Sequence, residues 1–157
     1  MTYCVTGLDH RDFASLFALD EKALEARGCR SVIADADRGY PCRVSLREVP
    51  KGERLLLLNH TSHAVNGPYR ATHAIFVSEK ARTCEPYIDD TPPVFQGRAL
   101  SLRGFDDDGM MVDAVLCEPG EADAGIRALF SETAVAFIHA HNAVRGCFSA
   151  RIDRHGG

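Results

Sequence analysis

Strong turn signals divide this chain into segments that are short enough to form single strands or short helices. Gly39-Tyr40-Pro41, Pro50-Lys51-Gly52-Glu53, Asn66-Gly67-Pro68 and Asp106-Asp107-Asp108-Gly109 each combine glycine or proline with polar neighbours, a composition that favours turns. The Asp-Gly pair also favours the positive φ angles of tight hairpins. The longest purely aliphatic run, residues 55–58, has the length of a buried strand, and no run approaches the ~20 apolar residues that cross a bilayer.

Between these turns, alternating or continuous apolar residues predict strands. The expected strands are residues 3–6, 30–34, 42–49, 55–58, 74–77, 99–105, 110–117, 135–141 and 147–153. Residues 42–49 and 55–58 form the clearest hairpin, because the turn at Pro50 joins them and Cys42, Val44 and Leu46 share one face. Residues 81–97 contain three prolines, so we expect an ordered segment without regular structure there.

Helices are expected at two places in the chain. Asp9 and Asp20 can cap two short N-terminal helices, and Pro119-Gly120 precedes a helix whose inner face carries Ile126, Leu129 and Phe130. The prediction is an α+β fold, a largely antiparallel β-sheet with helices near the N-terminus and before the last two strands. Neither a repeat nor a linker interrupts the sequence, so residues 1–157 are expected to form a single domain.

Composition narrows the class of protein. Of the 157 residues, 45% are hydrophobic and 25% are charged, as in an ordinary globular domain with a core of its own. The net charge of -4 disfavours a nucleic-acid partner, since binding to phosphates needs a basic surface. The six cysteines include no CxxC pair, and the N-terminal residues lack the features of a signal peptide. We therefore expect reduced thiols in a cytoplasmic protein that needs no metal, cofactor or membrane.

The predicted C-terminal hairpin contains the residues best suited to catalysis. His139 and His141 lie two residues apart on a strand, so both point to the same face and can act as a base with its orienting partner. They could also bind a metal together with His60 and His63, whereas the alternative is that one is a core histidine bonded to a carbonyl. Either Cys42 or Cys147, each close to an arginine in the sequence, is a candidate nucleophile. The alternative for each cysteine is a buried small hydrophobic residue.

Arginines supply the candidate ligand-binding residues, since the chain has 15 arginines and 3 lysines and the guanidinium fork suits carboxylate and phosphate. The candidate side chains are Arg43, Arg70, Asn142, Arg145 and Arg151. Arg43, Arg70 and Arg151 would hold the anionic group, while the histidines and Asn142 bind the rest of the ligand. The alternative is that each arginine pairs with an acidic residue on the surface, where such pairs have no functional role.

Several segments resemble a bacterial domain of unknown function, the family numbered 1203. They include Gly39-Tyr40-Pro41-Cys42-Arg43, Leu100-Ser101-Leu102-Arg103-Gly104-Phe105 and, most specifically, the run from His139 through Asn142 and Arg145 to Phe148. The resemblance extends from about residue 13 to the C-terminus. It implies a stand-alone bacterial cytoplasmic domain, and it transfers no catalytic residue.

Two functional hypotheses follow from these features. The first is a domain that binds a small anionic molecule in a pocket lined by arginine and histidine, either with or without catalysis by histidine or cysteine. The second is a non-catalytic interaction module that forms a homodimer. Convergence of the arginine and histidine side chains in one hollow would favour the first hypothesis, whereas scattered side chains with an exposed apolar patch would favour the second.

Overall fold

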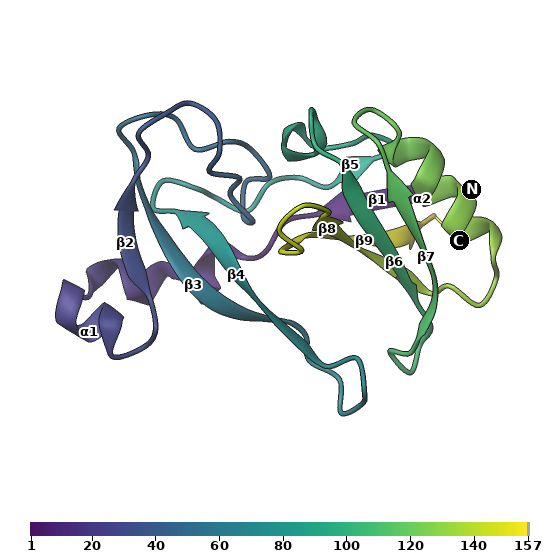
Figure 1. Cartoon of the computed structure of the whole chain (residues 1–157), viewed down its shortest axis with the longest axis horizontal. Helices are drawn as coiled ribbons and strands as arrows, with labels where there is room; N and C mark the ends of the chain where they lie inside the picture. The colour runs from purple at the N-terminus through teal and green to yellow at the C-terminus, as the bar shows by residue number, and fades with distance from the viewer. Residues whose placement is uncertain (157) are drawn as a thin grey trace.

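The structure, a computed structural model, describes residues 1–156. Its elements are, in chain order, β1 (Thr2–Thr6), the 3₁₀ helices η1 (His10–Asp12) and η2 (Ala14–Ala18), α1 (Glu21–Glu25), β2 (Arg30–Ile33), β3 (Arg54–His63), β4 (Ala71–Ser78), β5 (Tyr87–Ile88), the 3₁₀ helix η3 (Pro93–Phe95), β6 (Leu100–Phe105), β7 (Met111–Cys117), α2 (Ala122–Ser131), β8 (Phe137–Asn142) and β9 (Phe148–His155). They form two antiparallel sheets that lie side by side (Figure 1). The α+β prediction is confirmed, including the helix near the N-terminus and the helix before the last two strands.

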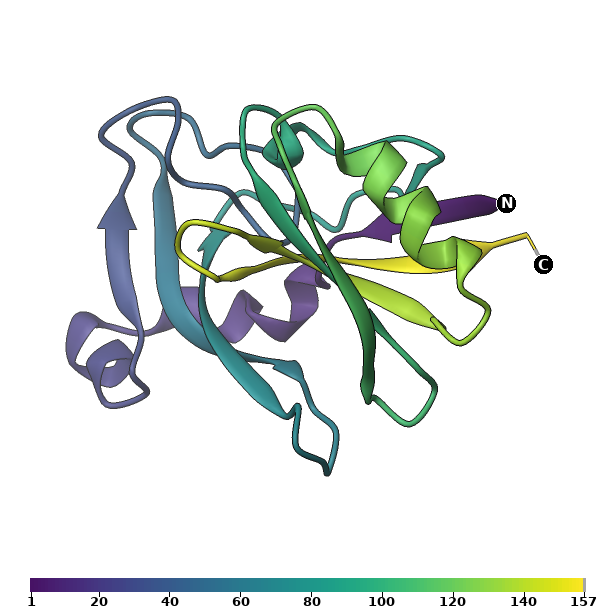
Figure 2. The same ribbon diagram turned by 45° about the vertical axis from the view of Figure 1, so that its right-hand side comes forward.

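The larger sheet has six strands in the order β5-β1-β9-β8-β6-β7, which places β8 near its centre as predicted. Helix α2 covers one face of this sheet (Figure 2), because its apolar residues Ile126, Leu129 and Phe130 are buried against the sheet's own core residues. Gly125 brings the helix close, since a Cβ there would overlap the Sγ atom of Cys117. Pairing of β1 with β9 brings the two chain ends together.

The smaller sheet has three strands in the order β2-β3-β4. A second core lies against it and includes Phe13, Leu24, Leu55 and Ile75. The N-terminal helices begin where the sequence predicts: the Asp20 side chain accepts a hydrogen bond from the backbone N–H of Ala23 and caps α1. Asp9 caps η1 in the same way, but the segment after it forms short 3₁₀ helices in place of the expected α-helix.

Residues 42–49 do not form the predicted strand, and the predicted hairpin with residues 55–58 is therefore wrong. The segment turns tightly, with Leu46 at a φ of 54°, and makes only isolated bridges to neighbouring chain. Cys42, Val44 and Leu46 are all fully buried, but so is Arg43. The apolar alternation reflects burial in a coiled loop between the two cores, and β3 pairs with β2 and β4 instead.

The C-terminal hairpin contains a β-bulge that the sequence did not reveal. Ala140 pairs with Ala150, whereas His141 pairs with Phe148, so Ser149 is an extra residue in β9. The bulge turns Phe148 away from the core formed by Ala150 and Ile152, and its ring contacts the rings of His139 and His141 instead. The expectation that Phe148 points the same way as Ile152 is therefore wrong.

No helix within residues 1–156 is both long and apolar enough to cross a membrane.

Candidate functional site

A layer of histidine and phenylalanine rings fills the space where the two sheets meet. His63 from β3 stacks on Phe105 from β6 with ring centroids 4.3 Å apart, and its centroid lies 5.3 Å from that of His139 on β8. His73 from β4 meets His141 edge to face at 4.8 Å. These contacts come from strands of both sheets, so the histidine layer is part of the interface that joins them.

Hydrogen bonds to backbone carbonyls fix which ring nitrogen of two histidines carries the proton. A carbonyl oxygen can only accept, so His141 donates from Nδ1 to the oxygen of Gly146 at 3.0 Å. His63 donates from Nε2 to the oxygen of Gly109 at 2.9 Å. Each neutral ring therefore keeps a lone pair on its other nitrogen, Nε2 of His141 and Nδ1 of His63.

Burial keeps the rings on β8 uncharged. It lowers the pKa of His139 to about 3, with further lowering from the positive charges of His63, Arg151, His141 and His73. It lowers the pKa of His141 to about 4, where the hydrogen bond to Gly146 acts in the opposite direction and Arg103, His73 and Arg43 lower the value further. Both imidazoles are thus neutral at physiological pH, because a buried cation among other cations is unfavourable.

His139 and His141 line a hollow of about 230 Å³ between the tips of the β3–β4 and β6–β7 hairpins, which both lie at the bottom of Figure 1. We call it the histidine hollow. Its other polar side chains are Ser62, His63, Tyr69, Arg70 and Arg103. Among residues 1–156, no group of three or more His, Cys, Asp and Glu side chains is arranged to hold a metal ion.

A second hollow, of about 770 Å³, lies beside the coiled segment that includes Arg43. We call it the arginine hollow, because four arginines line it: Arg38, Arg43, Arg98 and Arg145. Its volume is within the range of small-molecule sites in proteins. The positive charge is local, since the chain as a whole carries a net charge of -4.

Arg43 is the most unusual residue of the arginine hollow, because its side chain is buried and has no carboxylate partner within the described chain. Its Nε donates to the oxygen of Phe148 at 2.7 Å, and its Nη1 donates to the oxygen of Pro41. Burial lowers its pKa to about 10, which leaves it charged at neutral pH. A buried cation that only neutral carbonyls compensate favours a bound anion.

The remaining polar groups of the arginine hollow differ in whether the protein satisfies them. Asp35 accepts a hydrogen bond from the hydroxyl of Tyr40 at 2.8 Å, and Glu48 pairs with Arg98. Asn142 differs, because its Oδ1 atom is buried and has no hydrogen-bond partner within the described residues. Since nearly all buried polar atoms are bonded, Asn142 has an acceptor available for a donor on a ligand.

The structure distributes the nine predicted site residues over two hollows and their surroundings. Arg43, Asn142, Arg145 and Cys147 line the arginine hollow. Arg70, His139 and His141 line the histidine hollow. The sequence analysis expected all of these side chains in one hollow, and it did not anticipate that the ligand-binding and histidine groups would separate.

Two of the nine residues lie outside both hollows. Arg151 pairs with Asp153 at 2.8 Å, and its guanidinium lies over the ring of Phe137 at 3.9 Å. Cys42 is fully buried, and its Sγ accepts a hydrogen bond from the backbone N–H of Ser78 at 3.3 Å. These are the surroundings of an ion pair and of a core thiol.

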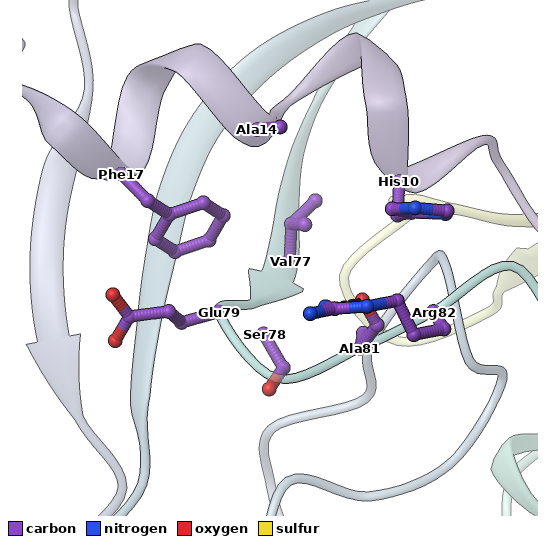
Figure 3. A pocket seen from close by; sticks show the side chains of 8 residues that line it. All are labelled: His10, Ala14, Phe17, Val77, Ser78, Glu79, Ala81 and Arg82. Carbon is purple, nitrogen blue, oxygen red and sulfur yellow. Dashed lines mark hydrogen bonds between the residues drawn. The ribbon is translucent and has the colours of Figure 1, made fainter.

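A third hollow, of about 380 Å³, lies between the N-terminal 3₁₀ helices and the end of β4. Figure 3 shows Phe17 and Val77 facing into it, with Glu79 and Arg82 at its border. Its charged groups already have partners, because Arg82 donates to two backbone carbonyls and Glu79 pairs with Arg54. None of the predicted site residues lines it.

Sequence reasoning missed several residues that line or flank these hollows. Arg38 and Arg98 lie in loops whose path depends on the whole fold, and no local pattern marks them. His73 could have been found, because Ala71, His73, Ile75 and Val77 alternate with more exposed residues. The predicted strand began three residues too late to include it.

Comparison with known proteins gives one match. The family model described as protein of unknown function (DUF1203) matches residues 39–154. The chain is a member of the DUF1203 family. The predicted resemblance is thus confirmed, although the match starts at residue 39 and the expected start was about residue 13. Both hollows take most of their lining from the part of the chain that the DUF1203 model covers. Searches of curated proteins and of solved structures found no match.

Proposed function

We propose that this DUF1203 protein binds a small organic anion in the arginine hollow. The observation that carries the proposal is the buried, carboxylate-free guanidinium of Arg43 in the wall of a hollow that also holds Arg38 and Arg145. Two or three guanidinium groups can bind one phosphate or carboxylate through charge-assisted hydrogen bonds. Asn142 Oδ1 would accept a hydrogen bond from a hydroxyl of the same ligand.

The walls of the arginine hollow indicate that the ligand also has an apolar part. Leu57, Phe76 and Val144 line it, and the ring of Tyr40 lies 5.4 Å from that of Phe76. Apolar and aromatic walls with a few fixed charges are typical of sites for organic anions. Phenyl phosphate has both features, whereas inorganic phosphate has only the charge.

Catalysis would fall to Cys147 if the ligand is also a substrate. Cys147 lines the arginine hollow and is partly exposed, and the charge of Arg43 favours a thiolate there. Both histidines predicted as catalytic line the other hollow, so a reaction in the arginine hollow would depend on the thiol.

Calorimetric titration with phenyl phosphate and with inorganic phosphate tests the binding proposal. We expect phenyl phosphate to bind more tightly, by about tenfold, because its ring removes apolar surface from water. Arg145→Gln and Arg38→Gln should each weaken phenyl phosphate binding by about tenfold. Arg27→Gln, which replaces an exposed arginine on the far side of the smaller sheet's core, is the matched control. The proposal fails if phenyl phosphate does not bind, or if the control weakens binding as much as the other two.

A second candidate function is the interaction module, supported by the free edge of β7. This strand ends the six-stranded sheet and exposes Val112 and Leu116, the latter to 64%. An exposed apolar edge can pair with the same edge of a second copy. Light scattering should then show a homodimer that Leu116→Lys converts to a monomer, and a monomeric wild-type protein would refute it.

We also propose a cytoplasmic location for the protein. All six cysteines are free in the structure, as is usual for proteins of a reducing compartment. Fractionation of the producing cells checks this, and recovery of the protein outside the cytoplasm would contradict it.

A further inference from the structure

The histidine hollow offers two positive charges that the protein leaves without a negative partner. Within residues 1–156, neither Arg70 nor Arg103 has a carboxylate at ion-pair distance; Arg103 donates to the hydroxyl of Ser101 at 3.3 Å, and Arg70 donates to the oxygen of Val65 at 3.4 Å. Both distances are long for hydrogen bonds of a guanidinium group. The two arginines are therefore available to bind an anionic group.

The same hollow offers hydrogen-bond acceptors beside these charges. The lone pairs on Nε2 of His141 and Nδ1 of His63 follow from the bonds that their other nitrogens donate to Gly146 and Gly109. These rings act as acceptors because burial keeps them neutral. A ligand that satisfies the hollow must thus combine a negative charge with a hydrogen-bond donor.

The size of the hollow and its walls limit the ligand further. At about 230 Å³ it is smaller than the sites that hold drug-sized molecules. Tyr69 and Phe105 meet edge to face at 6.3 Å and close one side with aromatic surface. Only a molecule of a few heavy atoms fits, and the two guanidinium groups disfavour a metal cation.

We propose that the histidine hollow is a second binding site, separate from the arginine hollow, for a small hydroxycarboxylic acid such as glycolate. The carboxylate would lie against Arg103 and Arg70, and the hydroxyl would donate to the free nitrogen of His141 or His63. This places a neutral imidazole at the hydroxyl proton, which is the geometry that a general base requires.

Titration with glycolate and with acetate at about pH 7.5 tests this site, because acetate has the charge and lacks the hydroxyl. Glycolate should bind about tenfold more tightly than acetate. In protein labelled with ¹⁵N at histidine, glycolate and not acetate should move the signal of the unprotonated nitrogen of His141 or of His63. Equal affinities, or histidine signals that do not move, would overturn the proposal.

Variants separate this proposal from the one for the arginine hollow. Arg103→Gln should weaken glycolate binding by about tenfold and leave phenyl phosphate binding unchanged. Arg145→Gln should do the reverse. Arg70→Gln, at an exposed position, provides a second test if Arg103→Gln does not fold. If Arg145→Gln abolishes glycolate binding, or if neither Arg103→Gln nor Arg70→Gln weakens it, the second site does not exist.

Discussion

The two hollows differ in how the fold treats buried cationic side chains. In the arginine hollow, burial lowers the pKa of Arg43 only to about 10, so the group remains a fixed positive charge. In the histidine hollow, burial lowers the pKa of His139 to about 3, so that ring is neutral. The same desolvation thus produces a site for an anion in one place and a set of proton acceptors in the other.

Acidification should separate the two regions with the largest effect on stability. The folded-state pKa values of His139 and His141, about 3 and about 4, lie below the ordinary value of 6.5. Between pH 6.5 and 4 the unfolded chain therefore binds protons that the folded chain does not, and stability falls as the pH falls. At pH 5 the two histidines should together cost about 4 kcal/mol of unfolding free energy relative to pH 7.5.

Urea denaturation at several pH values measures this loss. His139→Gln should remove about half of the slope between pH 6.5 and 5, because one of the two titrating groups is gone. His155→Gln, at an exposed position, is the matched control and should keep the slope of the wild-type protein. An unchanged slope in His139→Gln would show that burial does not lower the pKa of this ring.

The next largest effect should come from the packing that positions Arg43. A Cβ at Gly7 would overlap the carbonyl oxygen of Val44, and Leu8 donates to the carbonyl oxygen of Arg43 at 2.8 Å. Gly7→Ala should therefore reduce the unfolding free energy by about 3 kcal/mol and weaken phenyl phosphate binding. Gly67→Ala, where the nearest atom is 4.0 Å from the new Cβ, should change stability by less than about 0.5 kcal/mol. Equal stability of the two variants would contradict the packing described here.

A corresponding glycine closes the histidine hollow. Gly109 has a φ of +79°, and a Cβ there would meet the side chain of Val65 at 2.5 Å and Nε2 of His63 at 3.2 Å. Gly109→Ala should lower the unfolding free energy by about 2 kcal/mol and weaken glycolate binding, while phenyl phosphate binding persists. Denaturation and calorimetry check both effects, and loss of phenyl phosphate binding instead would show that the hollows are not independent.

The smallest effect is expected at Arg151, the predicted ligand-binding residue that lies outside both hollows. Arg151→Gln removes the ion pair with Asp153 and the contact with the ring of Phe137, which should cost about 1 kcal/mol. Affinity for phenyl phosphate should stay within about twofold of the wild-type value. A much larger loss of affinity would place Arg151 in the site after all.

Local sequence signals predicted the parts of the fold that depend on neighbouring residues. The caps at Asp9 and Asp20 and the turn at Gly109 are where the sequence places them. The segment 42–49 was mistaken for a strand, because burial on all sides gives the same apolar residues as one buried face. Its coiled path depends on contacts with both cores, which no local pattern contains.

The candidate site was predictable in its residue types and unpredictable in its division. The sequence indicated arginines and histidines as the functional groups, and seven of the nine predicted residues line a hollow. The bulge at Ser149 and the pairing of His141 with Phe148 decide which groups fall on which side. A one-residue shift of register is invisible in the alternation of a single strand.

The most direct test of the anion site is to record the guanidinium N–H signals of protein labelled with ¹⁵N at arginine during addition of phenyl phosphate. The account predicts that the Nε–H signals of Arg43 and Arg145 move with one common saturation curve, and that the signal of Arg103 stays in place. Movement of Arg103 with Arg43 unchanged, or small shifts spread over all arginines, would contradict it.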